Sequence, residues 1–230
     1  SFKKINIDKP YQSYLNARFV DIDKLKIINN LKIILLKALQ IVYGKIKGYE
    51  KSKNTYLFEE IKSIWLGRVC YKDYLKKVDF DLQKLKGKKF IYFPLLTEPE
   101  TALHGIADDF FFQLSAINII ARDLPADYLL VVKEHIIAFG RRPKDFYDQI
   151  NDLGNVVLVS PNELGLNYIK ESRAVACITG TAGWEACVMG IPVISFSRHN
   201  TWNFLKHVYY IDDFQNLRDI FFSIDKKNYP

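Results

Sequence analysis

The sequence has few cysteines and no residue spacing typical of a metal site or a disulfide framework. Its 230 residues include only Cys70, Cys177 and Cys187, none of them in a C-x-x-C spacing. Cys177 and Cys187 stand among apolar neighbours, which is typical of small core side chains. The four histidines show no ligand spacing either. We therefore expect no metal ion and a reducing, cytoplasmic setting.

Long apolar runs and nucleotide-hydrolysis motifs are also missing. No run of about eighteen uncharged apolar residues is present, so no transmembrane helix is expected. The first residues, Ser1 to Lys4, have no initiator Met and no apolar core after them. We therefore expect no signal peptide, and either a fragment or a processed chain. No P-loop is present, which argues against NTP hydrolysis of the P-loop kind.

Acidic residues are outnumbered, with 33 Lys and Arg against 26 Asp and Glu and a formal net charge of +7. A basic balance fits an anionic partner, such as a nucleotide phosphate, a membrane surface or a nucleic acid, and it also fits a merely soluble basic protein. The basic residues form no stripe with interleaved aromatics, so we expect no nucleic acid as partner.

Glycine and proline are nearly absent before residue 87, where helical patterns prevail. Apolar residues at three- and four-residue spacing predict a long helix over 22–43, ended by Gly44 and Gly48, and two more helices over 55–66 and 71–78. Lysines are interleaved in the first helix. They suit a helix lying on a membrane, or one packed on the main domain with its lysines in water, which we favour. Residues 1–87 are thus a helical segment or the remnant of a missing half, and residues 88–230 form the main domain.

From residue 88 onward, strands and helices alternate. Strands are predicted over 89–95, 128–134, 156–160, 174–178 and 191–196, and helices over 110–122, 144–153, 164–172, 182–189 and 215–224. The strands are continuous apolar runs, which is typical of a parallel sheet covered on both faces. The predicted fold class is α/β, a Rossmann-like open parallel sheet after a helical N-terminal segment. Ligands of such sheets bind beyond the carboxyl ends of the strands.

The most specific of these strand ends is the segment Thr179-Gly180-Thr181-Ala182-Gly183-Trp184-Glu185, which also opens a helix. Its glycines permit close backbone approach, and the free N–H groups and dipole of a helix start attract an anion. Glu185 can accept hydrogen bonds from ribose hydroxyls. The same residues fit a plain glycine turn in which Thr181 caps the helix and Glu185 completes a capping arrangement.

Three other strand ends carry ionisable or hydroxyl side chains. Glu98 and Glu100 follow the first strand and suit acid–base work, although loop carboxylates are commonly just solvated. Lys133 and His135 end the second strand and would point to one side if the strand continued, where they could bind a phosphate. For a lone histidine at a strand end, a structural hydrogen bond is the commoner role, and we favour it for His135 taken alone. Ser160 ends the third strand.

Taken in order, four segments resemble a known family: KKFIYFPLLTEPET, LPADYLLVVKEH, a strand ending in Ser-Pro, and ITGTAGWEACVMGIPVISF. They resemble the C-terminal half of bacterial capsule polysaccharide biosynthesis proteins. More broadly, they are similar to the second domain of GT-B glycosyltransferases and of non-hydrolysing nucleotide-sugar epimerases. The resemblance covers roughly Lys88 to Phe196. It implies a domain that holds the donor nucleotide-sugar, while another domain holds the acceptor.

The resemblance also implies roles for particular residues. Thr179, Gly180, Thr181, Ala182 and Gly183 would hold phosphate and Glu185 the ribose, with Lys133 and Ser160 as further nucleotide-binding candidates. Glu100 would match the acidic residue of a Q-P-E-like motif, and His135 the histidine of a K-E-H-P-like motif, both catalytic. The sequence departs from those motifs at Glu98, where Gln is usual, and at Ile136, where Pro is usual.

These observations predict a glycosyltransferase portion acting in capsule or other surface polysaccharide biosynthesis. The expected partners are a nucleotide-activated sugar, a glycan or lipid-linked acceptor, and optionally the inner face of the membrane. The donor is a substrate, and no separate cofactor is expected. Two alternatives stay open: an epimerase or hydrolase of the same fold, and a non-catalytic assembly module at the membrane surface.

Overall fold

The computed structural model describes residues 27–48, 57–98, 110, 112–211 and 217–226. The chain divides into two compact units, Ser1–Asp73 and Tyr74–Pro230. This division falls earlier than residue 87, where the composition of the sequence changes. The domain limits predicted from composition stay a prediction.

The first unit is described through two long helices, α2 (Ile27–Ile46) and the larger part of α3 (Leu57–Lys76). Helix α2 continues through Gly44, whereas the sequence predicted that it ends there; Gly48, with φ +73°, follows its end. Helix α3 replaces the two helices predicted over 55–66 and 71–78. One glycine inside a helix costs only about 1 kcal/mol, so Gly67 does not break it. Among the described residues, no helix is long and apolar enough to cross a membrane.

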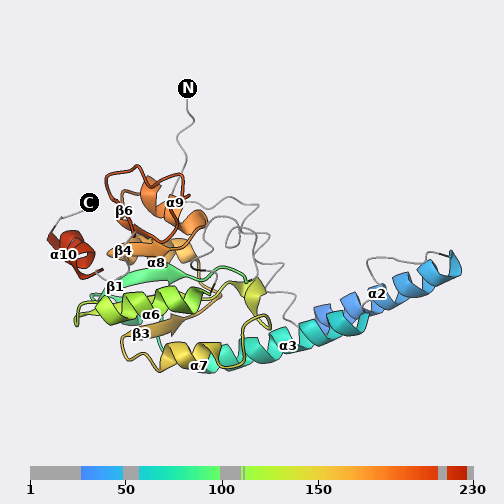
Figure 1. The fold of residues 1–230 in the computed structure, drawn as a ribbon. Helices are drawn as coiled ribbons and strands as arrows, with labels where there is room; N and C mark the ends of the chain where they lie inside the picture. The colour runs from blue at the N-terminus through green and yellow to red at the C-terminus, as the bar shows by residue number, and fades with distance from the viewer. Residues whose placement is uncertain (1–26, 49–56, 99–109, 111, 212–216, 227–230) are drawn as a thin grey trace. The chain divides into compact units, whose positions relative to one another are not determined.

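The second unit continues from the end of α3 into an alternation of strands and helices (Figure 1). Its elements are α4 (Leu82–Leu85), β1 (Lys89–Pro94), α6 (Gln113–Asp123), β2 (Tyr128–Lys133), the 3₁₀ helix η2 (Ile136–Ala138), α7 (Phe146–Asn151), β3 (Val156–Val159), α8 (Gly165–Glu171), β4 (Ala174–Cys177), α9 (Thr181–Val188), β5 (Val193–Ser195), β6 (Val208–Tyr210) and α10 (Arg218–Lys226).

The six strands form one sheet in the order β3-β2-β1-β4-β5-β6, and every neighbouring pair is parallel. This is the order of a Rossmann sheet, so the predicted fold class is confirmed. The five predicted strands are all present, each ending one residue earlier than expected. The sequence missed β6, which is three residues long and only partly buried at the edge of the sheet.

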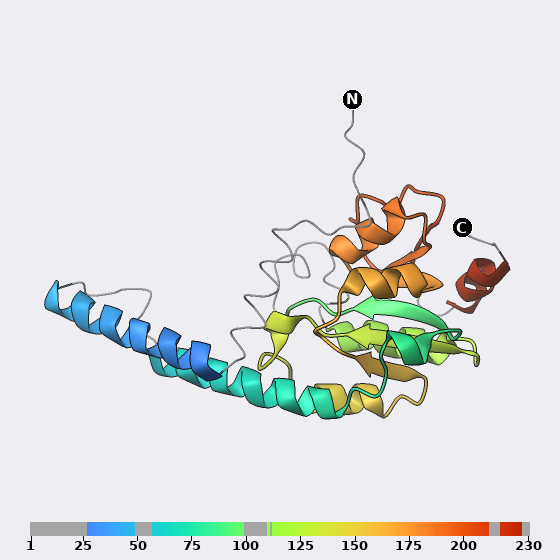
Figure 2. The same ribbon diagram turned by 180° about the vertical axis from the view of Figure 1, so that it is seen from behind.

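Helices α6 and α7 cover one face of the sheet, and α8 and α9 cover the other, as the two opposite views show (Figures 1 and 2). Strands β1, β2 and β4 lie between these layers, and Ile91, Leu130 and Val175 are completely buried. Burial on both faces explains why these strands are continuous apolar runs. The same arrangement brings all six carboxyl ends to one edge of the sheet.

Candidate functional site

The candidate site begins where the strand order reverses, between β1 and β4. Ligands of open α/β sheets bind in the crevice outside the carboxyl ends of the strands at this switch point. The two strand ends are in close contact here, because a Cβ atom added to Gly180 would lie 3.0 Å from Cδ2 of Leu96. The segment Thr179–Gly183 therefore follows the strand that borders the switch point.

Helix α9 starts at this point without a side-chain cap. Gly180 is its N-cap residue, with φ +99° and ψ 171°, and no side chain hydrogen-bonds to cap the first turn. Backbone in this region is essentially reserved for glycine. The alternative in which Thr181 caps the helix is therefore wrong, since Thr181 is the first helical residue and is exposed. The first turn can offer its N–H groups and the helix dipole to an anion.

Thr179 places a hydroxyl directly before this helix start. Its side chain is only 4% exposed, and within the described part of the chain Oγ1 has no hydrogen-bond partner. A buried hydroxyl without a partner is uncommon, because leaving it unsatisfied costs about 1–3 kcal/mol. The Thr179 hydroxyl is therefore available to donate a hydrogen bond to a ligand beside the helix N-terminus.

Gly183 serves packing in this structure. A Cβ atom there would lie 2.6 Å from Sγ of Cys177 and 3.0 Å from Cζ2 of Trp202. Both neighbours are protein groups, so the space that Gly183 leaves is filled by β4 and the loop after β5. The role toward a phosphate that the sequence suggested for Gly183 stays a prediction. Ala182 likewise packs against the hydrophobic core, which leaves its backbone N–H as the group able to meet a ligand.

We expect Gly183→Ala to lower the free energy of unfolding by about 1–3 kcal/mol, the usual cost of overpacking a dense core. The added methyl group would overlap the Sγ atom of Cys177, which is completely buried. Urea unfolding followed by circular dichroism measures this. Gly154→Ala is the matched control, because a Cβ there meets nothing within 4 Å. Equal stability of the two variants would contradict the packing role.

Glu185 lies one turn further along α9. It is half-buried, and burial raises the pKa of its carboxyl group above the ordinary value. No described residue neutralises this carboxylate through a hydrogen bond or an ion pair. Its role toward a ribose stays a prediction.

Lys133 and Ser160 lie at the ends of β2 and β3. Lys133 is 7% exposed, and its Nζ donates to the carbonyl of Pro161 at 3.1 Å. Ser160 is half-buried, and its Oγ accepts from the backbone N–H of Asn162 at 3.3 Å. This hydrogen bond of Lys133 therefore links the carboxyl end of β2 to the loop that follows β3.

His135 does not continue β2. The strand ends at Lys133, and His135 is the exposed N-cap residue of η2, so the alternation expected for Lys133 and His135 does not apply. The ring Nδ1 accepts from the backbone N–H of Ile137 at 3.4 Å. This contact assigns the proton of the neutral ring to Nε2, which is then a donor. The other candidate catalytic residue, Glu100, lies outside the described residues.

A buried ion-pair network at the ends of β1 and β2 escaped the sequence analysis. The Glu134 side chain is completely buried, and Arg142 donates to it through Nε at 2.8 Å and through one terminal nitrogen at 2.9 Å. Tyr147 donates to the same carboxylate at 2.7 Å. No sequence signal pairs Glu134 with Arg142, because η2 and a turn separate them.

The same guanidinium also reaches the loop after β1. Another terminal nitrogen of Arg142 lies 3.1 Å from the carboxylate of Glu98, and Arg142 also donates to the carbonyl of Leu96. Glu98 in turn accepts from the side-chain amide of Gln113 at 2.7 Å. Burial lowers the pKa of the Arg142 guanidinium, but the charge and hydrogen bonds of Glu134 outweigh it and raise the pKa. Arg142 thus stays charged and ties together the loops that carry Glu98 and His135.

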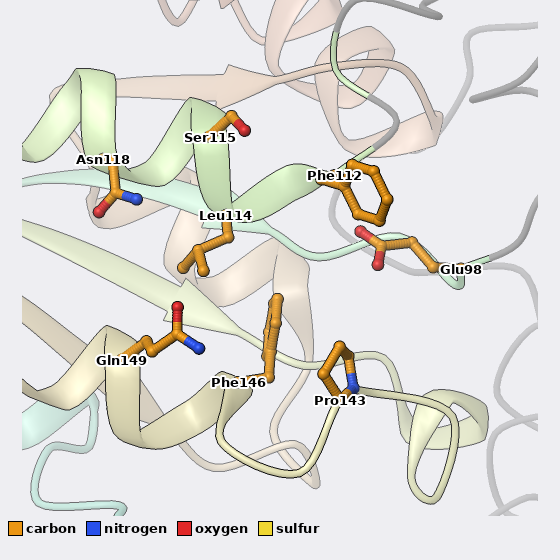
Figure 3. A pocket seen from close by; sticks show the side chains of 8 residues that line it. All are labelled: Glu98, Phe112, Leu114, Ser115, Asn118, Pro143, Phe146 and Gln149. Carbon is orange, nitrogen blue, oxygen red and sulfur yellow. The ribbon is translucent and has the colours of Figure 1, made fainter.

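A cavity of about 300 Å³ lies between α6 and α7, beside this network (Figure 3). Glu98 and Phe112 stand at one end of it, and Asn118 and Gln149 at the other. It is lined by Glu98, Phe112, Leu114, Ser115, Asn118, Pro143, Phe146 and Gln149. Glu98 thus belongs to both the network and the cavity wall. In the described ranges, no group of three or more His, Cys, Asp or Glu side chains could hold a metal ion.

Comparison with known proteins finds likeness in structure alone, since no family model and no curated protein matches the chain. One similar solved structure is KpsC of Thermosulfurimonas dismutans, a beta Kdo 2,7 transferase, at 17% identity over 63% of this chain and 47% of that one, with TM-score 0.39. Another is a putative UDP-N-acetylglucosamine 2-epimerase from Listeria monocytogenes, at 16% identity over 68% of this chain and 43% of that one, with TM-score 0.43. The chain spans less than half the length of both.

Proposed function

We propose that this chain binds a nucleotide-activated sugar at the switch point of its sheet and acts as the donor-binding portion of a glycosyltransferase of surface polysaccharide synthesis. The observation that carries the proposal is the buried hydroxyl of Thr179, which has no partner in the described chain. It stands directly before the uncapped N-terminus of α9, at the strand that borders the switch point. A phosphate oxygen would satisfy both the hydroxyl and the helix N–H groups.

In this proposal the diphosphate or monophosphate of the donor lies against Thr179 and the first turn of α9, and Glu185 accepts from the ribose. His135 faces the reacting end and donates through Nε2–H to the departing phosphate. Glu100 handles a proton or stabilises a developing cation. A glycan or lipid-linked acceptor is held by a second domain, and transfer takes place in the cytoplasm near the inner face of the membrane.

The alternative enzymatic function is that of an epimerase or hydrolase of the same fold. It would act on the same donor without an acceptor, so release of the free sugar or its epimer would distinguish it. A non-catalytic module would give neither product, even in the presence of the acceptor-binding half.

We expect Thr179→Val to weaken nucleotide binding about ten- to hundredfold, the loss of one hydrogen bond to a charged group. Valine keeps the shape of threonine, so stability should be unchanged or slightly higher once the unsatisfied hydroxyl is gone. Calorimetry against cytidine-, uridine- and guanosine-linked sugars and the free nucleotides measures the affinity. Thr179→Ser is the matched control, since it keeps the hydroxyl and should bind within a few-fold of the parent.

Two results would remove the proposal. Absence of binding by the unaltered chain to every nucleotide tested would remove the site itself. Equal affinity of Thr179→Val and Thr179→Ser would show that the buried hydroxyl makes no contact with the nucleotide.

A further inference from the structure

Helix α2 carries an apolar stripe that the described chain leaves uncovered. Leu31, Leu35, Leu39, Val42 and Ile46 follow one another at spacings of four, four, three and four residues, so they lie along one side of the helix. All five are more than half exposed, from 55% for Val42 to 77% for Ile46. A row of large aliphatic side chains in water is unfavourable, and such patches mark interaction sites.

The stripe is distinct from a second apolar row of α2 that is less exposed. Ile34, Ala38 and Ile41 recur at spacings of four and three residues and are half-buried. One residue of a helix turns the chain by about 100°, so this second row lies beside the stripe rather than within it. The helix therefore has a half-buried apolar row beside an exposed one.

The charged residues of α2 are all positive. Lys32 lies on one side of the stripe, and Lys45 continues the half-buried row of Ile34, Ala38 and Ile41 on the other side. Both are exposed. The helix contains no Asp or Glu. An exposed apolar stripe on a helix whose charged residues are all basic is typical of a helix that lies in the surface of an anionic membrane.

We propose that α2 docks on an anionic lipid surface, with its stripe among the acyl chains and its lysines at the headgroups. A second copy of the chain fits less well. The positions that flank a helix–helix seam meet each other across it, and here they would bring lysine against lysine with no acidic residue on α2 to neutralise them. Anionic headgroups neutralise those same lysines. The inference concerns α2 alone and holds whether or not the nucleotide site is as proposed.

Flotation of the full chain with vesicles tests the docking. Vesicles of phosphatidylcholine with phosphatidylglycerol should bind the chain at least about tenfold more strongly than pure phosphatidylcholine. Leu35→Glu should reduce that binding about tenfold or more, because a charge replaces a leucine that docking would bury among the acyl chains. Phe222→Glu is the matched control: Phe222 is an equally exposed apolar residue, 57% on α10, and its replacement should not change binding.

The double substitution Lys32→Glu with Lys45→Glu keeps the apolar stripe and reverses the charge at these two positions. It should therefore abolish the preference for anionic vesicles. Unaltered circular dichroism of each variant confirms that α2 is still folded. The docking is overturned if the unaltered chain does not float with anionic vesicles, or if Leu35→Glu binds as well as the parent. It is also overturned if the unaltered chain sediments as a dimer and Leu35→Glu sediments as a monomer, because the stripe would then bind a second copy of the chain.

Discussion

Replacing Arg142 with leucine is expected to lower the free energy of unfolding by about 3–5 kcal/mol, the usual cost of removing one partner from a buried ion pair. The Arg142 side chain is 2% exposed and serves two carboxylates, those of Glu134 and Glu98, which are 0% and 12% exposed. Without the guanidinium, both carboxylates lose their cation where little water can replace it. Tyr147 and Gln113 would remain as neutral donors, which cannot balance the charge.

Chemical unfolding of Arg142→Leu measures this effect, and Arg141→Leu is its control. Arg141 is the neighbouring residue, carries the same charge and is exposed, so its replacement should cost well under 1 kcal/mol, as is usual for surface charges. A loss below about 1 kcal/mol for Arg142→Leu would show that the network is screened by water and does not hold the two loops. Where the variant still folds, the loops after β1 and β2 lose their link, and nucleotide affinity should fall as well.

His135→Ala is expected to reduce turnover about a hundredfold or more in an enzyme that includes the acceptor-binding half, the scale of an acid–base contribution. The contact of Nδ1 with the N–H of Ile137 leaves the proton on Nε2, and that N–H is the proposed donor for the departing phosphate. Nucleotide affinity should change far less, because the proposal places the phosphate mainly at α9. Glu100→Gln is expected to have a similar effect on turnover.

The control for this experiment is His207→Ala. His207 immediately precedes β6 at the amino edge of the sheet, and its Nε2 lies 3.1 Å from the carbonyl of Cys187. Its loss should cost stability and leave turnover within a few-fold. Near-normal turnover of His135→Ala would remove this histidine from the mechanism and leave only the donor-binding proposal.

The fold could be predicted from the sequence because its signals are local. Uninterrupted apolar runs such as residues 128–132 occur where both faces of a strand are buried, and each strand end was predicted within one residue. Strand β6 was not predicted, although residues 208–211 are a short apolar run; only three of them form the strand, at the edge of the sheet. Helix α3 appeared as two helices because its apolar periodicity is weak around Gly67, while a continuous backbone tolerates one glycine.

The candidate site was only partly predictable. Thr179 and Gly180 were placed correctly beyond a buried strand, since the strand–glycine–helix order is local. The packing contact of Gly183 was not predictable, because a Cβ atom there would meet Trp202, nineteen residues away in the chain. The partnership of Glu134 with Arg142 and Glu98 was invisible for the same reason: it joins loops that follow two different strands.

The sequence by itself determined the α/β class, the parallel strands and the edge of the sheet where polar residues gather, because hydrophobic periodicity and turn residues act over a few neighbouring positions. Only the tertiary structure decided which of those polar groups are paired and which are left open. Arg142 is paired with two carboxylates, one of them completely buried, while the hydroxyl of Thr179 has no partner in the described chain. Pairing depends on contacts between segments distant in the chain, and these contacts exist only once the sheet brings its strand ends together.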